Sequence, residues 1–380
     1  MGSSLGAMMG LVRSYRRAHD EVSLCLARRE RIQETTFRLD SFSSEDFLSL
    51  FRFLPHNIVK LVSLLHLVVP FPRNRLAVDS VECFCVVLRR LASPCRWYDM
   101  EELFGRHAPA LCVVFYATLE VLMRRWDPLL SEWRVDFLRE RAALYSTKIE
   151  EAGAYLDKCV GCIDVTTILV SRPGGGFQRA CYSGHKRRHA IKFQSVITPD
   201  GLIAHLFGPW EGRRHDMTWY HESGLDAVLS DALVIQGVQH YIYGDAAYLV
   251  RPWLQASFRG VMKPNKEACN ETMKVPRAAI ECGFKDVKQV CAFRDFLRKL
   301  KIREGPVGLF YRAGALIWKL RCCAYGSATA DFFKCPPPSW EVYSSSLPGQ
   351  GAAADSASGE ESGPSGAGGA GEGEDGAGGA

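Results

Sequence analysis

Residues 159–167 read CVGCIDVTT, and this short stretch decides the fold class. Its apolar and β-branched residues favour a strand, whereas Asp164 does not. A carboxylate in such a strand is costly to bury unless a metal ion or a base lies beside it. We therefore predict a buried strand that carries a functional acid.

Two later segments place further acids on regular elements. Residues 241–248, YIYGDAAY, form an aromatic and β-branched run that ends near Asp245, and residues 275–288 have the pattern of a helix that carries Glu281. Each acid alone is more often a helix cap or a surface carboxylate. Together, carboxylates on two strands and a helix can hold two divalent cations about 3.5–4 Å apart, as phosphoryl transfer requires. We predict that Asp164 bridges two Mg²⁺ ions, which prefer oxygen ligands, and that Asp245 and Glu281 each complete one site.

The remaining pattern around these acids predicts an α/β layout of ribonuclease H type, with a mixed sheet flanked by helices. The expected order is three strands (160–170, 190–198 and 202–207), a helix from about 216, the strand ending at 245, a helix over 249–257, a short strand at 260–263, the Glu281 helix and a closing helix at 309–323. Residues 199–201, Pro-Asp-Gly, predict a hairpin turn between the second and third strands.

Composition divides the chain into four parts. We predict a basic helix or arm at 1–40, an all-α domain at 41–150, the catalytic domain at 151–335 and a disordered Gly/Ala/Ser/Glu-rich acidic tail at 336–380. Within the all-α domain, a short helix at 98–104, Gly105 and a longer helix from 108 follow the order of a helix-turn-helix. The longer helix either reads a DNA major groove or, because 111–123 is so apolar, is largely buried.

The charge balance favours a polyanionic partner. The formal net charge is +5, yet the last 45 residues hold seven acids and no Lys or Arg, so the rest of the chain has 47 basic residues against 35 acids. Scattered Arg on a solvated surface is the alternative interpretation. No apolar run is long enough to span a bilayer, and no membrane association is predicted. Cys159 and Cys162 lack further zinc ligands at suitable spacing and are predicted to be core residues.

Several residues are predicted to support the acids. A basic cluster on the predicted hairpin, expected close to Asp164, either contacts DNA phosphates or keeps the surface soluble, and it also suits nuclear import. Its members are His185, Lys186, Arg187, Arg188, His189 and Lys192. Asp216 is either a fourth metal-site acid or a helix N-cap. Arg277 lies one helical turn before Glu281, where it pairs with that carboxylate or contacts phosphate, and Asn270 and Met273 are expected to fix the preceding loop.

Most of residues 40–330 resembles the PIF/Harbinger transposases, a branch of the DDE superfamily. The resemblance lies in IDVTT at 163–167, YSGHKRRHAIKFQSVITPDGLI at 182–203, GRRHD at 212–216, YGDAAY at 243–248, the residues Asn270, Met273 and Arg277 with Glu281, and an upstream stretch at 88–111 that looks like the family's helical region. It implies a ribonuclease H-like fold, cleavage and joining of double-stranded DNA with two Mg²⁺ or Mn²⁺ ions, and a triad at Asp164, Asp245 and Glu281. It also implies a nuclear location, a Myb-like accessory protein as partner, and self-association as a homo-oligomer.

Two alternatives stay open. Val165 and Thr167 stand where the family often has Gly and His, so catalytic competence is a separate question from fold. One alternative is a host-adopted DNA-binding protein that has lost nuclease activity. The other is an α/β protein of unrelated function, in which the three acids would lie far apart.

Overall fold

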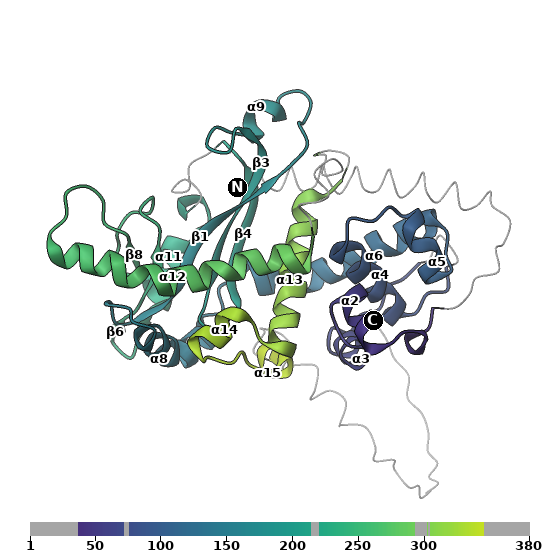
Figure 1. The fold of residues 1–380 in the computed structure, drawn as a ribbon, viewed down its shortest axis with the longest axis horizontal. Coiled ribbons are helices and arrows are strands. Elements are labelled where there is room, and N and C mark those ends of the chain that lie inside the picture. Colours follow the sequence, from purple (N-terminus) through teal and green to yellow (C-terminus); the bar gives the residue numbers. More distant parts are fainter. Residues whose placement is uncertain (1–36, 72–75, 214–219, 293–301, 303–304, 346–380) are drawn as a thin grey trace, which may run out of the picture.

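The computed structural model describes residues 37–71, 76–213, 220–292, 302 and 305–345 (Figure 1). Most of the predicted basic arm at 1–40 and most of the acidic tail therefore lie outside the described residues. In Figure 1 a group of helices from the first part of the chain lies beside a sheet covered by later helices, and α13 runs between the two.

Helices fill the first part of the chain because their apolar residues recur at helical spacing and polar residues cap them. Asp79 begins α4, where its side chain accepts hydrogen bonds from Val81 N at 2.7 Å and Glu82 N at 2.9 Å. α4 contacts α2, α3 and α6 and forms the centre of this region. The elements are η1 (Leu39–Ser41), α2 (Ser44–Phe51), α3 (Pro55–Leu64), α4 (Ser80–Ala92), η2 (Tyr98–Met100), α5 (Glu101–Phe104), α6 (Ala108–Trp126), α7 (Pro128–Ser131) and α8 (Val135–Glu151).

The second part is a mixed sheet with helices, as predicted. Its elements are β1 (Cys159–Leu169), α9 (Phe177–Cys181), β2 (Tyr182–Ser183), β3 (Arg188–Ile197), β4 (Ile203–Glu211), α11 (Leu225–Ala232), β5 (Val234–Ile235), β6 (Val238–Gln239), β7 (Tyr241–Gly244), β8 (Leu254–Ala256), α12 (Pro264–Val290), α13 (Val307–Tyr325), α14 (Ala328–Phe333) and α15 (Trp340–Ser345). The strand order is β2-β3-β1-β7-β8, with β4 also paired to β3. β1, β3 and β4 are antiparallel neighbours, whereas β7 and β8 run parallel to β1.

Both faces of β1 are covered. Successive residues of a strand point to opposite faces, and the neighbours Cys162 and Ile163 are both buried. α12 lies on the face of Cys162, because a Cβ added at Gly283 would come within 3.0 Å of Ile197, the cross-strand partner of Cys162. Figure 1 shows α12 crossing in front of the strands. This packing sets a helix directly over the middle of β1.

The helix-turn-helix prediction agrees with the structure in the order of its helices. α5 and α6 follow the predicted order around Gly105, whose φ is 61°, and the two helical segments are bent by 85°. However, α6 packs between α4 and α13, and no residue of α6 before Arg124 is exposed. This packing favours the alternative in which the helix is largely buried, and major-groove reading stays an untested prediction.

Two short elements were predicted wrongly. Residues 249–257 do not form a helix; their last part is β8, which pairs with β7. Residues 260–263 form no strand and belong to the loop before α12. The Glu281 helix begins at Pro264, earlier than the pattern indicated, and runs through Pro276.

The predicted boundary of the tail is too early. Residues 336–345 are ordered against the helices, and α15 buries Trp340 and Tyr343 to 4% and 2% exposure. Arg134 fixes this helix by donating to Tyr343 O at 2.6 Å. Two aromatic residues three positions apart are enough to dock one short helix.

Among the described residues, no single helix is long and apolar enough to cross a bilayer. Two bent pairs, 44–64 and 98–126, meet that test by length and composition only. Their apolar residues contribute to the buried core of the helical region.

Candidate active site

Asp164 lies in the middle of β1, opposite Ser195 of β3, and its side chain is half-buried. Burial raises the pKa of this carboxyl from 3.8 to about 6. A backbone hydrogen bond from Val165 acts in the opposite direction, whereas the negative charges of Glu281 and Asp245 raise the pKa further. The three acids are therefore close enough to influence one another.

Asp245 follows β7 at the same edge of the sheet. β1 and β7 are parallel, with Cys162 opposite Tyr243, so Asp164 and Asp245 each stand two residues beyond this pair. The N–H of Ala247 donates to Asp245 Oδ1 at 2.9 Å and fixes the carboxylate in its turn. Parallel pairing thus brings together two acids that are distant along the chain.

Gly244 makes this close arrangement possible, and the sequence analysis did not single it out. A Cβ at this position would lie 2.6 Å from Tyr248 Cδ2 and 3.0 Å from Ile163 Cγ2, so a larger residue would displace the turn that carries Asp245. The signal was present as a glycine directly before the acid in the 241–248 segment.

Glu281 lies on α12, which contacts β1 and β3. Its Oε1 is 2.6 Å from Nε of Arg277, one turn earlier, and the two side chains are 31% and 27% exposed. The predicted pairing of Arg277 with Glu281 is therefore confirmed. The contact is short, yet Glu281 Oε1 is buried and accepts no well-directed hydrogen bond from any described residue.

Arg277 is the cation among the three acids. Burial lowers its pKa, but the charges of Glu281, Asp164 and Asp245 overcome this effect and the pKa is raised overall. The acids on β1, after β7 and on α12 therefore surround one guanidinium group. A positive charge at this point offsets the repulsion between carboxylates that burial would otherwise strengthen.

Residues 163–303 match the family described as DDE superfamily endonuclease, and this range contains all three acids. Residues 163–303, called the DDE region below, are therefore similar to DDE superfamily endonucleases. A curated relative, Protein ALP1-like from Arabidopsis thaliana, is 22% identical over 191 residues, which make up 46% of this chain and 44% of that protein. The chain thus spans less than half the length of the curated relative that it matches. No solved structure matches the chain. These findings confirm the relationship to DDE endonucleases that the motifs predicted.

The acids of the DDE region suit a hard cation in their chemistry. They offer carboxylate oxygens, the ligands that Mg²⁺ prefers, and Glu281 Oε1 is a buried acceptor without a well-directed donor. Their arrangement is not a closed cage: among the described residues, no three His, Cys, Asp or Glu side chains converge as a ready metal-binding group. Since Arg277 holds Glu281, a cation would have to replace that guanidinium group as the partner of the glutamate.

The basic hairpin of the DDE region lies further from Asp164 than predicted. The turn at 184–187 and Arg188 are exposed, but Arg188 is seven residues along β3 from Ser195, about 23 Å at ~3.3 Å per residue. Lys192 is nearer, about 10 Å by the same spacing, and is half-buried. The cluster therefore extends away from the acids along the β1–β3 ribbon.

The other predicted residues have different outcomes. Asp216 lies outside the described residues. Asn270 fixes the loop before α12 as predicted: its Oδ1 accepts from Phe258 N at 3.0 Å, and its Nδ2 donates to Phe258 O at 3.1 Å. Met273 is fully buried in the core, which supports the start of the same helix. Cys159 and Cys162 are free and buried, in agreement with their predicted core role.

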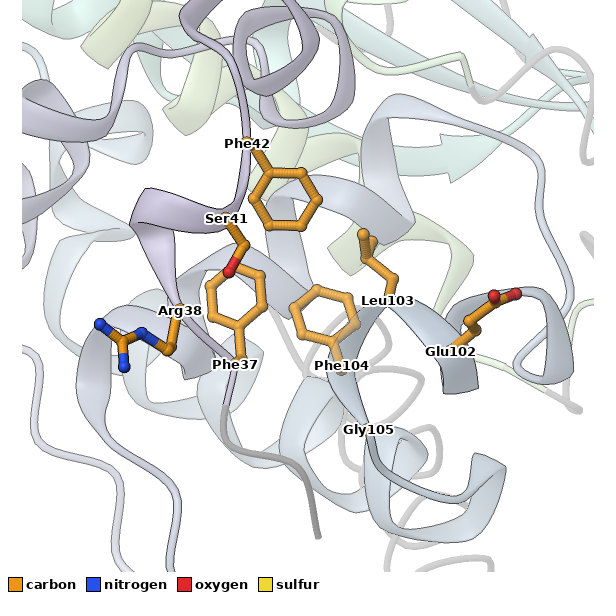
Figure 2. Close-up of a pocket in the computed structure, with 8 residues that line it drawn as sticks. All are labelled: Phe37, Arg38, Ser41, Phe42, Glu102, Leu103, Phe104 and Gly105. Carbon is orange, nitrogen blue, oxygen red and sulfur yellow. The ribbon is translucent and has the colours of Figure 1, made fainter.

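A separate pocket lies in the helical region, where the described residues begin, with a volume of about 380 Å³. Figure 2 shows the rings of Phe37, Phe42 and Phe104 gathered together, with Arg38 and Glu102 pointing away from them. The ring centroids of Phe37 and Phe104 are 5.0 Å apart. None of the DDE acids lines this pocket.

Proposed function

We propose that this protein is a transposase-type DNA endonuclease that cuts and joins phosphodiester bonds at an Asp-Asp-Glu triad with two Mg²⁺ or Mn²⁺ ions. The observation that carries this proposal is that the charges of Asp164, Asp245 and Glu281 all act on Arg277, within a region that matches DDE endonucleases. An unrelated α/β protein would have no reason to concentrate these charges at one edge of its sheet.

We further propose that the catalytic domain has the ribonuclease H-like fold. Three antiparallel strands followed by two strands parallel to the first, in the order β4-β3-β1-β7-β8, support this assignment. The triad position supports it as well, since the first acid lies on the central strand and the glutamate on a helix that crosses it.

The three acids have a common task in this proposal. Two divalent cations, when bound, activate the attacking oxygen and neutralise the leaving oxygen. Asp164, Asp245 and Glu281 would hold these ions through their carboxylate oxygens. Because the pKa of Asp164 is about 6 in the chain without metal, this carboxyl becomes protonated in mild acid, so metal binding should weaken there. Arg277, once released from Glu281, can contact a phosphate oxygen.

The basic hairpin would contact DNA away from the cut. A separation of about 23 Å along β3 corresponds to roughly six or seven base pairs at ~3.4 Å each. Arg187 and Arg188, both exposed, would contact phosphates there without reading sequence.

The test is cleavage of supercoiled plasmid and of a labelled duplex by the purified full chain in Mg²⁺ or Mn²⁺. We expect wild type to nick both and Asp245→Asn to be inactive, since Asn can still accept the hydrogen bond from Ala247 N and keep the turn. Asp157→Asn is the matched control, because that side chain is 67% exposed at the opposite end of β1. Cleavage that persists in the Asp245 variant would exclude the triad from the mechanism.

A second candidate function is DNA binding without cleavage, in a host-adopted protein. The Arg277–Glu281 ion pair favours it, because the guanidinium group stands where a cation would neutralise the acids. Wild type that binds duplex DNA but cuts none, with either metal, would decide for this candidate. Restored cleavage in Arg277→Gln would show instead that the ion pair alone blocks the site.

Location and partners follow from the same proposal. A DNA substrate and the exposed cluster at 185–188 support a nuclear location, which fluorescence microscopy of the tagged chain with and without Lys186→Ala and Arg187→Ala would test. A Myb-like accessory protein and self-association are proposed from the resemblance to PIF/Harbinger transposases, and co-purification tests both.

A further inference from the structure

The loop between β8 and α12 begins at the edge of the sheet that carries the acids. β7 and β8 are parallel, with Gly244 opposite Ala256, so Ser257 emerges beside Asp245. Neighbouring strands are about 4.8 Å apart, so the loop starts within one strand spacing of that acid. Figure 1 shows this loop at the end of α12 that extends beyond the sheet.

Contacts near its start and near its end fix the loop, and Asn270 Nδ2 donates to Met262 Sδ at 3.2 Å near the end. Tyr243 OH and Ser257 Oγ are 2.9 Å apart at its start, and Asn270 makes two hydrogen bonds to the backbone of Phe258. Lys266 Nζ lies 4.9 Å from the centre of the Phe258 ring. The loop is therefore held at a defined position relative to Asp245, and Asn270 on α12 is the residue that holds it.

The surface of this loop combines positive charge with an exposed apolar tip. Arg259 and Lys263 are exposed, and neither forms an ion pair with any described residue. Val261 between them is fully exposed, at 107% of its reference area. An apolar side chain in such a position buries no surface in the isolated chain and so does not stabilise it. The guanidinium and ammonium groups on either side of it are suited to bind a phosphate backbone.

We propose that residues 257–263 form a second DNA-contacting element of the DDE region, on the other side of the acids from the basic hairpin. Arg259 and Lys263 contact phosphates, and Val261 packs against a sugar or base in the minor groove. The duplex would then be held on both sides of the scissile phosphate, with the hairpin along β1–β3 and this loop beyond β8. The inference rests on the proposed function and assigns residues that the triad does not include.

The test is the salt dependence of binding between the full chain and a labelled 30-base-pair duplex, measured by fluorescence anisotropy in chelator, so that cleavage does not interfere. Each phosphate contact that is lost should reduce the slope of log K against log salt by about 1. We expect Arg259→Ala and Lys263→Ala each to show this loss, and Arg259→Glu to show a larger one. Lys274→Ala is the matched control, because Lys274 is exposed on α12 and paired with Glu271 at 2.5 Å; its slope should equal that of wild type.

Val261→Ala should weaken binding up to about tenfold without changing the slope, since it removes apolar contact and no charge. Val275→Ala is its control, because Val275 is 56% exposed on α12 and lies away from the loop. If wild type binds and its slope is unchanged in the Arg259 and Lys263 variants, the loop is not a DNA contact while the proposed function stands. If wild type binds no duplex, the proposed function fails and this inference fails with it.

Discussion

Replacing Asp164 by Asn should make the folded protein more stable near neutral pH while it removes cleavage. The folded-state pKa of about 6 is above the ordinary value of 3.8, so the ionised carboxylate is disfavoured by the fold. Between these two pH values the folded chain binds more protons than the unfolded chain, and stability falls as pH rises. The loss of folding stability caused by the ionised Asp164 is absent below about pH 4 and fully present above about pH 6. Asparagine carries no charge and so avoids it.

The magnitude follows from the size of the shift. A difference of about two pKa units corresponds to about 3 kcal/mol at most, and partial exposure of Asp164 to solvent reduces it to about 1–2 kcal/mol. Urea unfolding in chelator at pH 4, 6 and 8 measures this free energy. We expect Asp164→Asn to match wild type at pH 4 and to exceed its stability at pH 8. Asp231→Asn is the matched control: this side chain is 88% exposed and the variant retains Asp164, so its pH profile of stability should follow that of wild type.

The same two proteins test the metal. Mg²⁺ at 100 times its dissociation constant should stabilise wild type by about 2.7 kcal/mol and the Asn variant by much less. Equal stabilisation of both proteins would mean that Asp164 is no ligand. A stability difference between them that is the same at pH 4 and pH 8 would refute the electrostatic reasoning, because a change of packing does not titrate.

Three further predictions concern buried groups. Arg106→Met should lower the free energy of unfolding in urea by about 3–5 kcal/mol, because it leaves the carboxylate of Glu82, which is 1% exposed, without the guanidinium group 2.5 Å away. Adding Glu82→Leu should recover much of this loss. A double variant as unstable as the single one would contradict the prediction. Gly244→Ala should lower cleavage more than tenfold and stability by about 1–3 kcal/mol, because the new Cβ meets Tyr248; unchanged cleavage would show that the turn is not critical. Lys319 is fully buried and its pKa is lowered to about 7, so the free-energy cost of burying its charge is present below that pH and disappears towards about pH 10. Lys319→Met should therefore be more stable than wild type at pH 6 by a few kcal/mol and lose this advantage by pH 10. A stability advantage that is constant with pH would refute the assignment of the effect to the buried charge.

The strands were predictable where the pattern was long. β1, β3 and β4 were recognised by their β-branched runs and by the turn at 199–201, and each agrees with the structure to within a few residues. The sequence did not reveal that this turn is buried. Asp200 is fully buried and accepts from Tyr145 OH at 2.5 Å, a contact with a helix 55 residues earlier in the chain. Such long-range packing has no local signature.

Short elements were not predictable. β8 has three residues, too few to show a period of two, and residues 249–257 were predicted as one helix. Pairing with β7 decided the outcome, and that information is not local. For α12, the predicted helix covered 275–288, whereas the helix begins earlier, with Pro264 in its first turn. Proline is best tolerated there, so the earlier proline was the better signal.

The positions of the acids could be predicted because topology sets them, whereas their side-chain partners could not. Once β1 and β7 run parallel, Asp164 and Asp245 must share an edge, whatever else the chain does. Which cation neutralises Glu281 depends on rotamers of two side chains four residues apart, and Arg277 and a metal ion compete for the same oxygen. Catalysis in this proposal therefore requires that Arg277 leave Glu281 when metal and DNA arrive. A phosphate group provides the alternative partner that makes this exchange favourable, which couples DNA binding to assembly of the metal site.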